Sequence, residues 1–306
     1  MRISAYPRVP DELDLPKGVL ITQCLQNDFV KPLPPYTPLP NLLHVGHDEA
    51  RRLMGDDPAQ RPVARFLAWA LAQPDDRLRV VHIRDWHDPT DPSQREHLAH
   101  FGPHGLRGTD GAAFAFPSLP AAGKQVVTVD GDALNDFLHS NLGAELDGII
   151  ASCAPGIRLG IVGVWTEAKV TFLAYELRAR HPDARIGVCA ALTAGSSRAQ
   201  HFAALDQLRR LLGVEVFASV AGFARFLAGD DTELPLPPRG PTGVTLELEG
   251  LGSPRARRLL SASDVRPSST STPVPSVTSA AASSKKPPVN GPRRRKNACS
   301  SGRSRS

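Results

Sequence analysis

One segment, 163–170, constrains the fold more than any other part of the chain, and it reads Gly-Val-Trp-Thr-Glu-Ala-Lys-Val. It follows an apolar run at 157–164, rich in isoleucine, leucine and valine, which is typical of a buried parallel strand. From Val170 to Leu177 the apolar residues recur at the spacing of one helical face. A turn between such a strand and helix lies at the carboxyl end of a sheet, where open α/β folds bind ligands. We therefore expect the chemistry of this protein near 163–170.

Similar apolar runs and amphipathic stretches alternate along most of the chain. This alternation predicts an α/β fold, a three-layer doubly wound arrangement with helices on both faces of a six-stranded parallel sheet. A loop at 84–124, rich in histidine, aspartate, proline and glycine, is long enough to be functional. The expected strands are 18–23, 77–83, 125–129, 157–164, 185–190 and 213–217, and the expected helices are 58–73, 133–142, 166–180, 199–212 and 220–227.

Composition divides the chain into a domain at 1–234 and a tail at 235–306. The chain has 306 residues, 41% of them hydrophobic, which is enough for one α/β core and an additional tail. The tail is rich in proline, serine and basic residues and is expected to be disordered. Much of the excess positive charge lies there, including Pro292–Lys296, so the net charge of +5 does not indicate a nucleic-acid-binding fold. The basic cluster is either a solvated tail or a contact for an acidic partner or nucleic acid.

The cysteines and the apolar segments bear on location. Cys24, Cys153, Cys189 and Cys299 show neither metal-type nor disulfide-framework spacing, which suits a reducing compartment. No charged-then-apolar leader and no run of eighteen apolar residues is present, so we expect neither export nor membrane insertion. These features predict a cytoplasmic protein.

Four short motifs follow one another in a recognisable order. They are Gln-Asn-Asp-Phe at 26–29, Asp-Trp-His at 85–87, Gly-Thr-Asp-Gly-Ala at 108–112 and Gly-Val-Trp-Thr at 163–166. In this order they resemble the isochorismatase-like hydrolases, and the loop is most similar to that of the nicotinamidases. The resemblance covers roughly 17–228. It implies a six-stranded three-layer α/β fold, usually oligomeric, that cleaves small amides or related compounds with an Asp-Lys-Cys triad. It also implies a cis peptide before Trp165.

The triad positions differ from the family pattern. Cys24 stands where the family has its catalytic aspartate, two residues before the Gln-Asn-Asp-Phe motif, and Lys169 stands where it has its catalytic cysteine. The place of the catalytic lysine is best matched by Asp130, or by Asp132 if the loop is shifted. The resemblance places Phe29, Trp165 and Thr166 at the substrate pocket, and the bulk of Trp165 is expected to narrow it.

Two functions are consistent with this substitution. In the first, the protein is a hydrolase acting on a small amide or carbonyl compound: Cys24 is the nucleophile, Lys169 stabilises its thiolate and Asp130 orients the site or accepts a proton. A variant of this hypothesis makes Lys169 the nucleophile, through an imine, if burial lowers its pKa. In the second, catalysis has been lost and the domain binds a small metabolite. Without the resemblance, Cys24 would be interpreted as a core residue and Asp130-Gly131 as a turn.

Histidines and an aspartate in the long loop predict a metal site. Asp85 and His87 lie two apart at a strand end, and His104 matches a later nicotinamidase histidine. His100 is our candidate for the remaining ligand, with His97 as the alternative. These ligand types suit zinc, iron or manganese and do not discriminate among them.

Overall fold

The computed structural model describes residues 18–55, 57, 62–116, 124–153, 156–232 and 235–236. Apart from 235–236, the predicted tail lies outside this part of the chain. The elements run in the order β1 (Gly18–Gln23), α1 (Asn27–Val30), α2 (His47–Met54), α3 (Pro62–Leu71), β2 (Leu78–Asp85), the 3-10 helix η2 (Pro92–Gln94), α4 (Arg95–Phe101), β3 (Val126–Gly131), α5 (Leu142–Ala151), β4 (Arg158–Val164), α6 (Lys169–Arg180), β5 (Arg185–Ala194), α7 (Arg198–Leu212), β6 (Glu215–Phe217) and α8 (Val220–Leu227).

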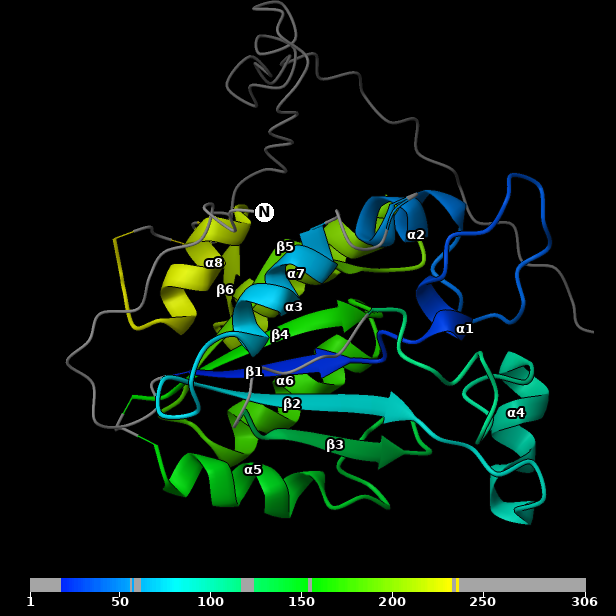
Figure 1. Ribbon diagram of the computed structural model, residues 1–306, viewed down its shortest axis with the longest axis horizontal. Helices are drawn as coiled ribbons and strands as arrows, with labels where there is room; N and C mark the ends of the chain where they lie inside the picture. Colours follow the sequence, from blue (N-terminus) through cyan, green and yellow to red (C-terminus); the bar gives the residue numbers. More distant parts are fainter. Residues whose placement is uncertain are drawn as a thin grey trace, which may run out of the picture. The chain divides into compact units, whose positions relative to one another are not determined.

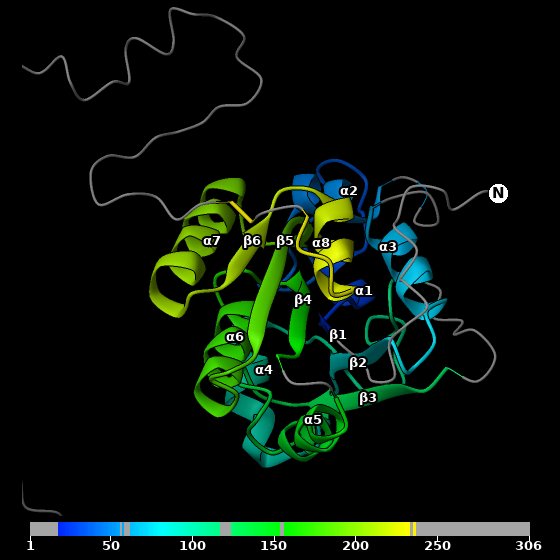
Figure 2. The same cartoon turned by 90° about the vertical axis from the view of Figure 1, so that its left-hand side faces the viewer.

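The six strands form one parallel sheet in the order β3-β2-β1-β4-β5-β6. The two edges, β3 and β6, are visible in Figure 2. The chain reverses its direction of growth between β1 and β4, which creates a topological switch point at their carboxyl ends. In Figure 1 the arrowheads of β1, β2 and β3 point toward α1 and α4, so these short helices flank the end of the sheet where a ligand is expected.

Helices cover both faces of the sheet and bury two apolar layers. One layer joins α2, α3 and α8 to the sheet and is rich in phenylalanine and leucine; the other joins α5, α6 and α7 and is rich in isoleucine, leucine and valine. Alternate residues of β1 serve different layers, since Leu20 packs in the first and Val19 and Ile21 in the second. The predicted three-layer α/β fold is thus confirmed. Among the described residues, no helix combines the length and apolarity that a membrane span requires.

The predicted strands are all present, with ends shifted by a few residues, but one predicted helix is wrong. Residues 133–141 form turns, and α5 begins only at Leu142. Polar side chains in this segment bond to nearby backbone: Asn135 accepts from the N–H of Phe137, and Ser140 donates to the carbonyl of Asp136. Such local bonds compete with helix formation. The loop predicted at 84–124 contains η2 and α4, which the periodicity did not indicate.

Gly163 allows β1 and β4 to approach at the switch point. Its φ is +123°, and a Cβ placed on it would lie 2.0 Å from the carbonyl oxygen of Gln23. We expect Gly163→Ala to lower the free energy of unfolding by about 3 kcal/mol, because the methyl group must displace strand backbone and occupy a strained conformation. Gly148→Ala is the control, since nothing lies within 4 Å of that position in α5 and alanine favours helix. Urea denaturation of both variants measures the difference; equal stability would contradict the expectation.

Candidate functional site

Four side chains meet near the switch point, and each comes from a different segment of the chain. Cys24 follows β1, Asp85 ends β2, Asp136 lies in the turns after β3, and Lys169 begins α6 just beyond β4. All four are at most 5% exposed. Because they come from the carboxyl ends of neighbouring parallel strands, residues far apart in sequence form one buried polar cluster.

Hydrogen bonds link all members of this cluster. The Lys169 Nζ atom donates to Asp85 Oδ1, to Asp136 Oδ1 at 3.0 Å and to Cys24 Sγ at 3.5 Å. The Cys24 thiol donates to Asp85 Oδ1 at 3.2 Å. Gln23 closes the group, since its Nε2 lies 3.0 Å from Cys24 Sγ and 2.9 Å from Asp136 Oδ2. Lys169 is therefore held between two carboxylates, with the sulfur beside it.

The charges of the cluster follow from this geometry. Burial, followed by the charge of Asp85, raises the pKa of Cys24 well above its ordinary value, despite the nearby Lys169. Burial alone would lower the pKa of Lys169, but Asp136 and Asp85 outweigh it and hold that pKa well above its ordinary value. Burial would raise the pKa of Asp85, yet the charge of Lys169 keeps it below its usual range. At neutral pH the cluster thus holds a thiol, an ammonium group and an ionised Asp85.

The backbone of Asp85 is fixed by the first sequence motif. The Gln26 side chain accepts from the Asp85 N–H at 2.7 Å and donates to the Asp85 carbonyl at 2.8 Å. The same amide donates to the Ala112 carbonyl at 2.9 Å. Gly105 packs on Asp85 so closely that a Cβ there would lie 2.8 Å from the aspartate side chain. Residues of three of the four motifs thus form one hydrogen-bonded group around the Asp85 backbone.

Asp130 does not belong to the cluster, and its predicted place there is wrong. Val129 is buried, so the alternation of a strand turns Asp130 outward, where it pairs with Arg84 at 2.7 Å and is 45% exposed. Asp132 is also outside the cluster and contacts Gln94 and His139. The carboxyl group that contacts Lys169 after the third strand is that of Asp136. Its signal in the sequence was an aspartate among turn-forming residues just beyond the third strand, a pattern that the expected helix concealed.

A narrow pocket opens beside the cluster; the empty volume of about 280 Å³ there includes the open solvent at its mouth. Phe29 and Trp165 lie on its wall, and the Val164–Trp165 peptide is cis, as the resemblance implies. Thr166 does not line the pocket and does not cap α6; it is fully buried and its hydroxyl bonds to His201 Nδ1 at 2.8 Å. The lining residues are Cys24, Phe29, Leu43, Asp85, Leu134, Val164, Trp165, Ala168 and Lys169.

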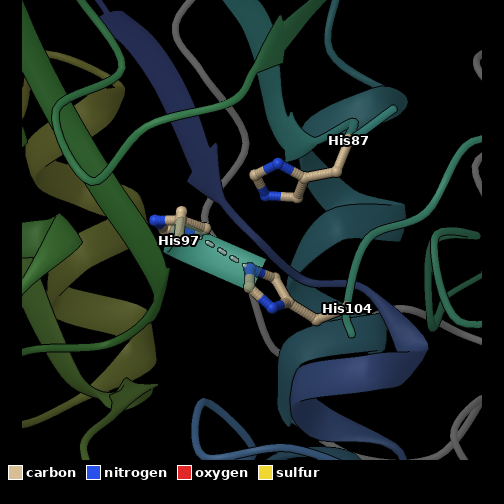
Figure 3. A group of neighbouring side chains, drawn as sticks. All are labelled: His87, His97 and His104. Atoms are coloured by element: carbon tan, nitrogen blue, oxygen red, sulfur yellow. Dashed lines mark hydrogen bonds between the residues drawn. The ribbon is translucent and has the colours of Figure 1, made fainter. Parts of the chain in front are cut away.

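Three histidines form a second group that adjoins Asp85. Figure 3 shows His87, His97 and His104 with their rings facing one another. One ring nitrogen from each lies within 4.8 Å of the others, and His97 Nε2 is 3.2 Å from His104 Nε2. Asp85 Oδ2 is 3.8 Å from both His87 Nε2 and His104 Nε2. His100, our first candidate for this place, is exposed and lies edge-on to Phe101, whereas His97, our alternative one turn earlier on α4, belongs to the group.

The outer ring nitrogens are anchored in a way that suits a metal site. The Gln94 Oε1 atom accepts from the Asp88 N–H, so His87 Nδ1, 3.0 Å away, must be a donor to the same oxygen. His104 Nδ1 similarly donates to the Gly102 carbonyl at 2.7 Å. In the neutral rings both Nε2 atoms then carry a lone pair that faces the group, and His87 Nε2 is buried without a hydrogen-bond partner among the described residues. Outer hydrogen bonds of this kind orient metal-binding histidines. Burial also lowers the pKa of His97 to about 4, so its imidazole is neutral and able to bind metal.

The fold is similar to that of solved structures of a nicotinamidase/pyrazinamidase and of an isochorismatase family protein. Two solved structures show this likeness. A nicotinamidase/pyrazinamidase from Bacillus subtilis has 21% identity and a TM-score of 0.50, covering 65% of this chain and 98% of its own. An isochorismatase family protein from Desulfovibrio vulgaris has 18% identity and a TM-score of 0.50, covering 69% of this chain and 98% of its own. No family model and no curated protein matches the sequence.

Proposed function

We propose that this domain binds a small amide or carbonyl compound next to a divalent metal, without forming a covalent bond through Cys24 or Lys169. The observation that carries the proposal is the placement of the Lys169 ammonium group between Asp85 and Asp136. A nucleophilic cysteine must ionise, and a lysine that forms imines must lose its proton. In this site the raised pKa of Cys24 keeps its thiol protonated, and the raised pKa of Lys169 keeps its ammonium group protonated.

The pocket offers a suitable place for a small, mostly apolar molecule with one polar end. Phe29, Leu43 and Trp165 provide apolar walls, while Asp85 and Lys169 provide the polar base. Lys169 is also the first residue of α6, where the N–H groups of Val170 and Phe172 already donate to the carbonyls of Trp165 and Ala168, which leaves those of Lys169 and Thr171 for a ligand. A ligand carbonyl oxygen is therefore expected to point toward this helix end.

Asp85, His87, His97 and His104 are the residues that would hold the metal. A bound divalent ion would supply a Lewis acid that polarises a nearby carbonyl group. Lys169 keeps Asp85 ionised, and Gln94 keeps the His87 lone pair directed inward, so the ligand set is prepared before any ion arrives. Nitrogen and oxygen ligands of this kind fit zinc, iron or manganese.

A hydrolase that uses Cys24 is the second candidate, and the contact between Cys24 and Asp85 favours it. In that case Asp85 Oδ1, 3.2 Å from the sulfur, would accept the thiol proton while Lys169 stabilises the thiolate. The transfer is unfavourable in the resting site because the pKa of the thiol is raised and the pKa of the carboxyl group is lowered. The first proposal therefore has the stronger support.

The two candidates differ in the reactivity of Cys24. At pH 7 we expect iodoacetamide to modify Cys24 no faster than the half-buried Cys153, as measured by peptide mass spectrometry, with the unfolded protein as the control for complete labelling. Zinc-loaded protein mixed with small amides and ketones should show saturation-transfer NMR signals from bound ligand and no mass increase. Labelling of Cys24 at least about tenfold faster than Cys153, or an acyl adduct on it, would instead support the hydrolase.

A further inference from the structure

Asp85 is shared between the two groups of side chains, and each of its oxygens faces one of them. Oδ1 accepts from the Lys169 ammonium group and from the Cys24 thiol. Oδ2 faces the histidines, at 3.8 Å from the Nε2 atoms of His87 and His104. A metal bound to Oδ2 would thus lie across a single carboxylate group from a fixed positive charge.

We propose that Lys169 is a resident cation that competes with a divalent metal for Asp85 and so sets the affinity of the histidine site. This inference rests on the metal site of the proposed function. Lys169 has the opposite effects of orienting the carboxylate and repelling the incoming ion. Repulsion dominates, because Gln26 already holds the Asp85 backbone on both sides, and two cations at a buried carboxylate are screened less than two cations in bulk water.

Asp136 moderates this competition from the other side of the lysine. Its Oδ1 accepts from Lys169 at 3.0 Å, and among the described residues no hydrogen bond or ion pair joins Asp136 to the histidines. Part of the lysine charge is therefore balanced away from the metal site. If this balance is removed, Lys169 interacts with Asp85 alone and the metal should bind less tightly. Substitutions of Lys169 and Asp136 are thus expected to change metal affinity in opposite directions.

Zinc competition with a chromophoric chelator tests the inference on the full chain after removal of metal with EDTA. We expect Lys169→Met to tighten the zinc dissociation constant roughly tenfold or more, and Asp136→Asn to weaken it by roughly fivefold. The double variant Lys169→Met/Asp136→Asn removes the lysine together with its second carboxyl partner and should still bind zinc more tightly than the wild type. It keeps the test valid if the single lysine variant does not fold. A His97→Ala background measures zinc bound elsewhere on the chain.

Damage to the fold would weaken zinc binding in every variant, so only the opposite changes support the role of Lys169. If the wild type binds zinc but both lysine variants bind it equally or more weakly, the inference is wrong and the metal site stands. If the wild type binds no more zinc than the His97→Ala protein, the metal site of the proposed function fails, and the inference fails with it.

Discussion

The His97→Ala variant is expected to lose tight zinc binding, whereas His100→Ala, from the same helix, is expected to keep it. His97 faces His87 and His104, while His100 is exposed on α4. Removing one of four ligands from a buried site should weaken the dissociation constant by about 100-fold or more, because second-sphere changes alone commonly cost 10- to 100-fold. Isothermal titration calorimetry with zinc measures both variants against the wild type.

Both substitutions replace a histidine with alanine on one short helix, so a general effect on α4 would appear in both. Thermal unfolding in EDTA should confirm that the two proteins are about equally stable without metal. If His100→Ala were the variant that lost zinc, or if neither did, the proposed ligand set would be wrong.

The fold could be predicted from the sequence because its signals are local. Apolar runs at 18–23 and 157–164 and their helical partners recur along the chain, and each strand forms where its run lies. The failure at 133–142 has a local cause as well. Apolar residues there have a helical spacing, but the side chains of Asn135 and Ser140 bond to nearby backbone and hold the segment in turns. Hydrophobic periodicity alone does not reveal that competition.

The site was only partly predictable, because its members meet through tertiary structure. Cys24 and Lys169 were found since each sits at a fixed distance from a motif, and the structure brings them together. Asp136 was missed because it lies in irregular chain, where no periodicity indicates which carboxylate points inward. The choice between His97 and His100 depended on the orientation of α4, which the sequence of a seven-residue helix with no buried residue does not determine.

The same substitutions that suggested a permuted triad produce a different electrostatic result in three dimensions. The motif positions placed Cys24 and Lys169 at one pocket, and a lysine beside a cysteine predicted a thiolate. In the structure the lysine has two carboxylates closer than the sulfur, so its charge is already balanced. The order of residues along a chain does not show how many partners one charge has. That number decides whether Lys169 activates Cys24 or stabilises an ion cluster.

The Lys169→Met variant is expected to lose about 3–5 kcal/mol of unfolding free energy at pH 7 in the presence of EDTA. Its ammonium group is nearly inaccessible, and removing it leaves Asp85 and Asp136 buried without their cation. Breaking a buried ion pair from one side commonly has an effect of this size. Lys31→Met is the matched control, because Lys31 pairs with Asp110 on the surface, where both side chains are more than half exposed. We expect that change to stay within about 0.5 kcal/mol.

The effect of Lys169→Met on the free energy of unfolding can come from lost charge or from lost packing, and its dependence on pH separates the two. In the wild type the lowered pKa of Asp85 contributes stability above its unfolded value near 3.8, and this contribution declines as the pH falls. Burial already raises the pKa of Asp136 in the wild type. Without Lys169, burial raises the pKa of Asp85 as well and that of Asp136 further, so the variant gains stability on protonation. The difference between the two proteins should therefore be greatest near neutral pH and narrow toward pH 4. It should narrow again above about pH 10.5, where Lys169 in the unfolded wild-type chain loses its proton while the folded state keeps it. Urea denaturation across this range would show a constant difference if Lys169 contributed only through the packing of its methylene groups.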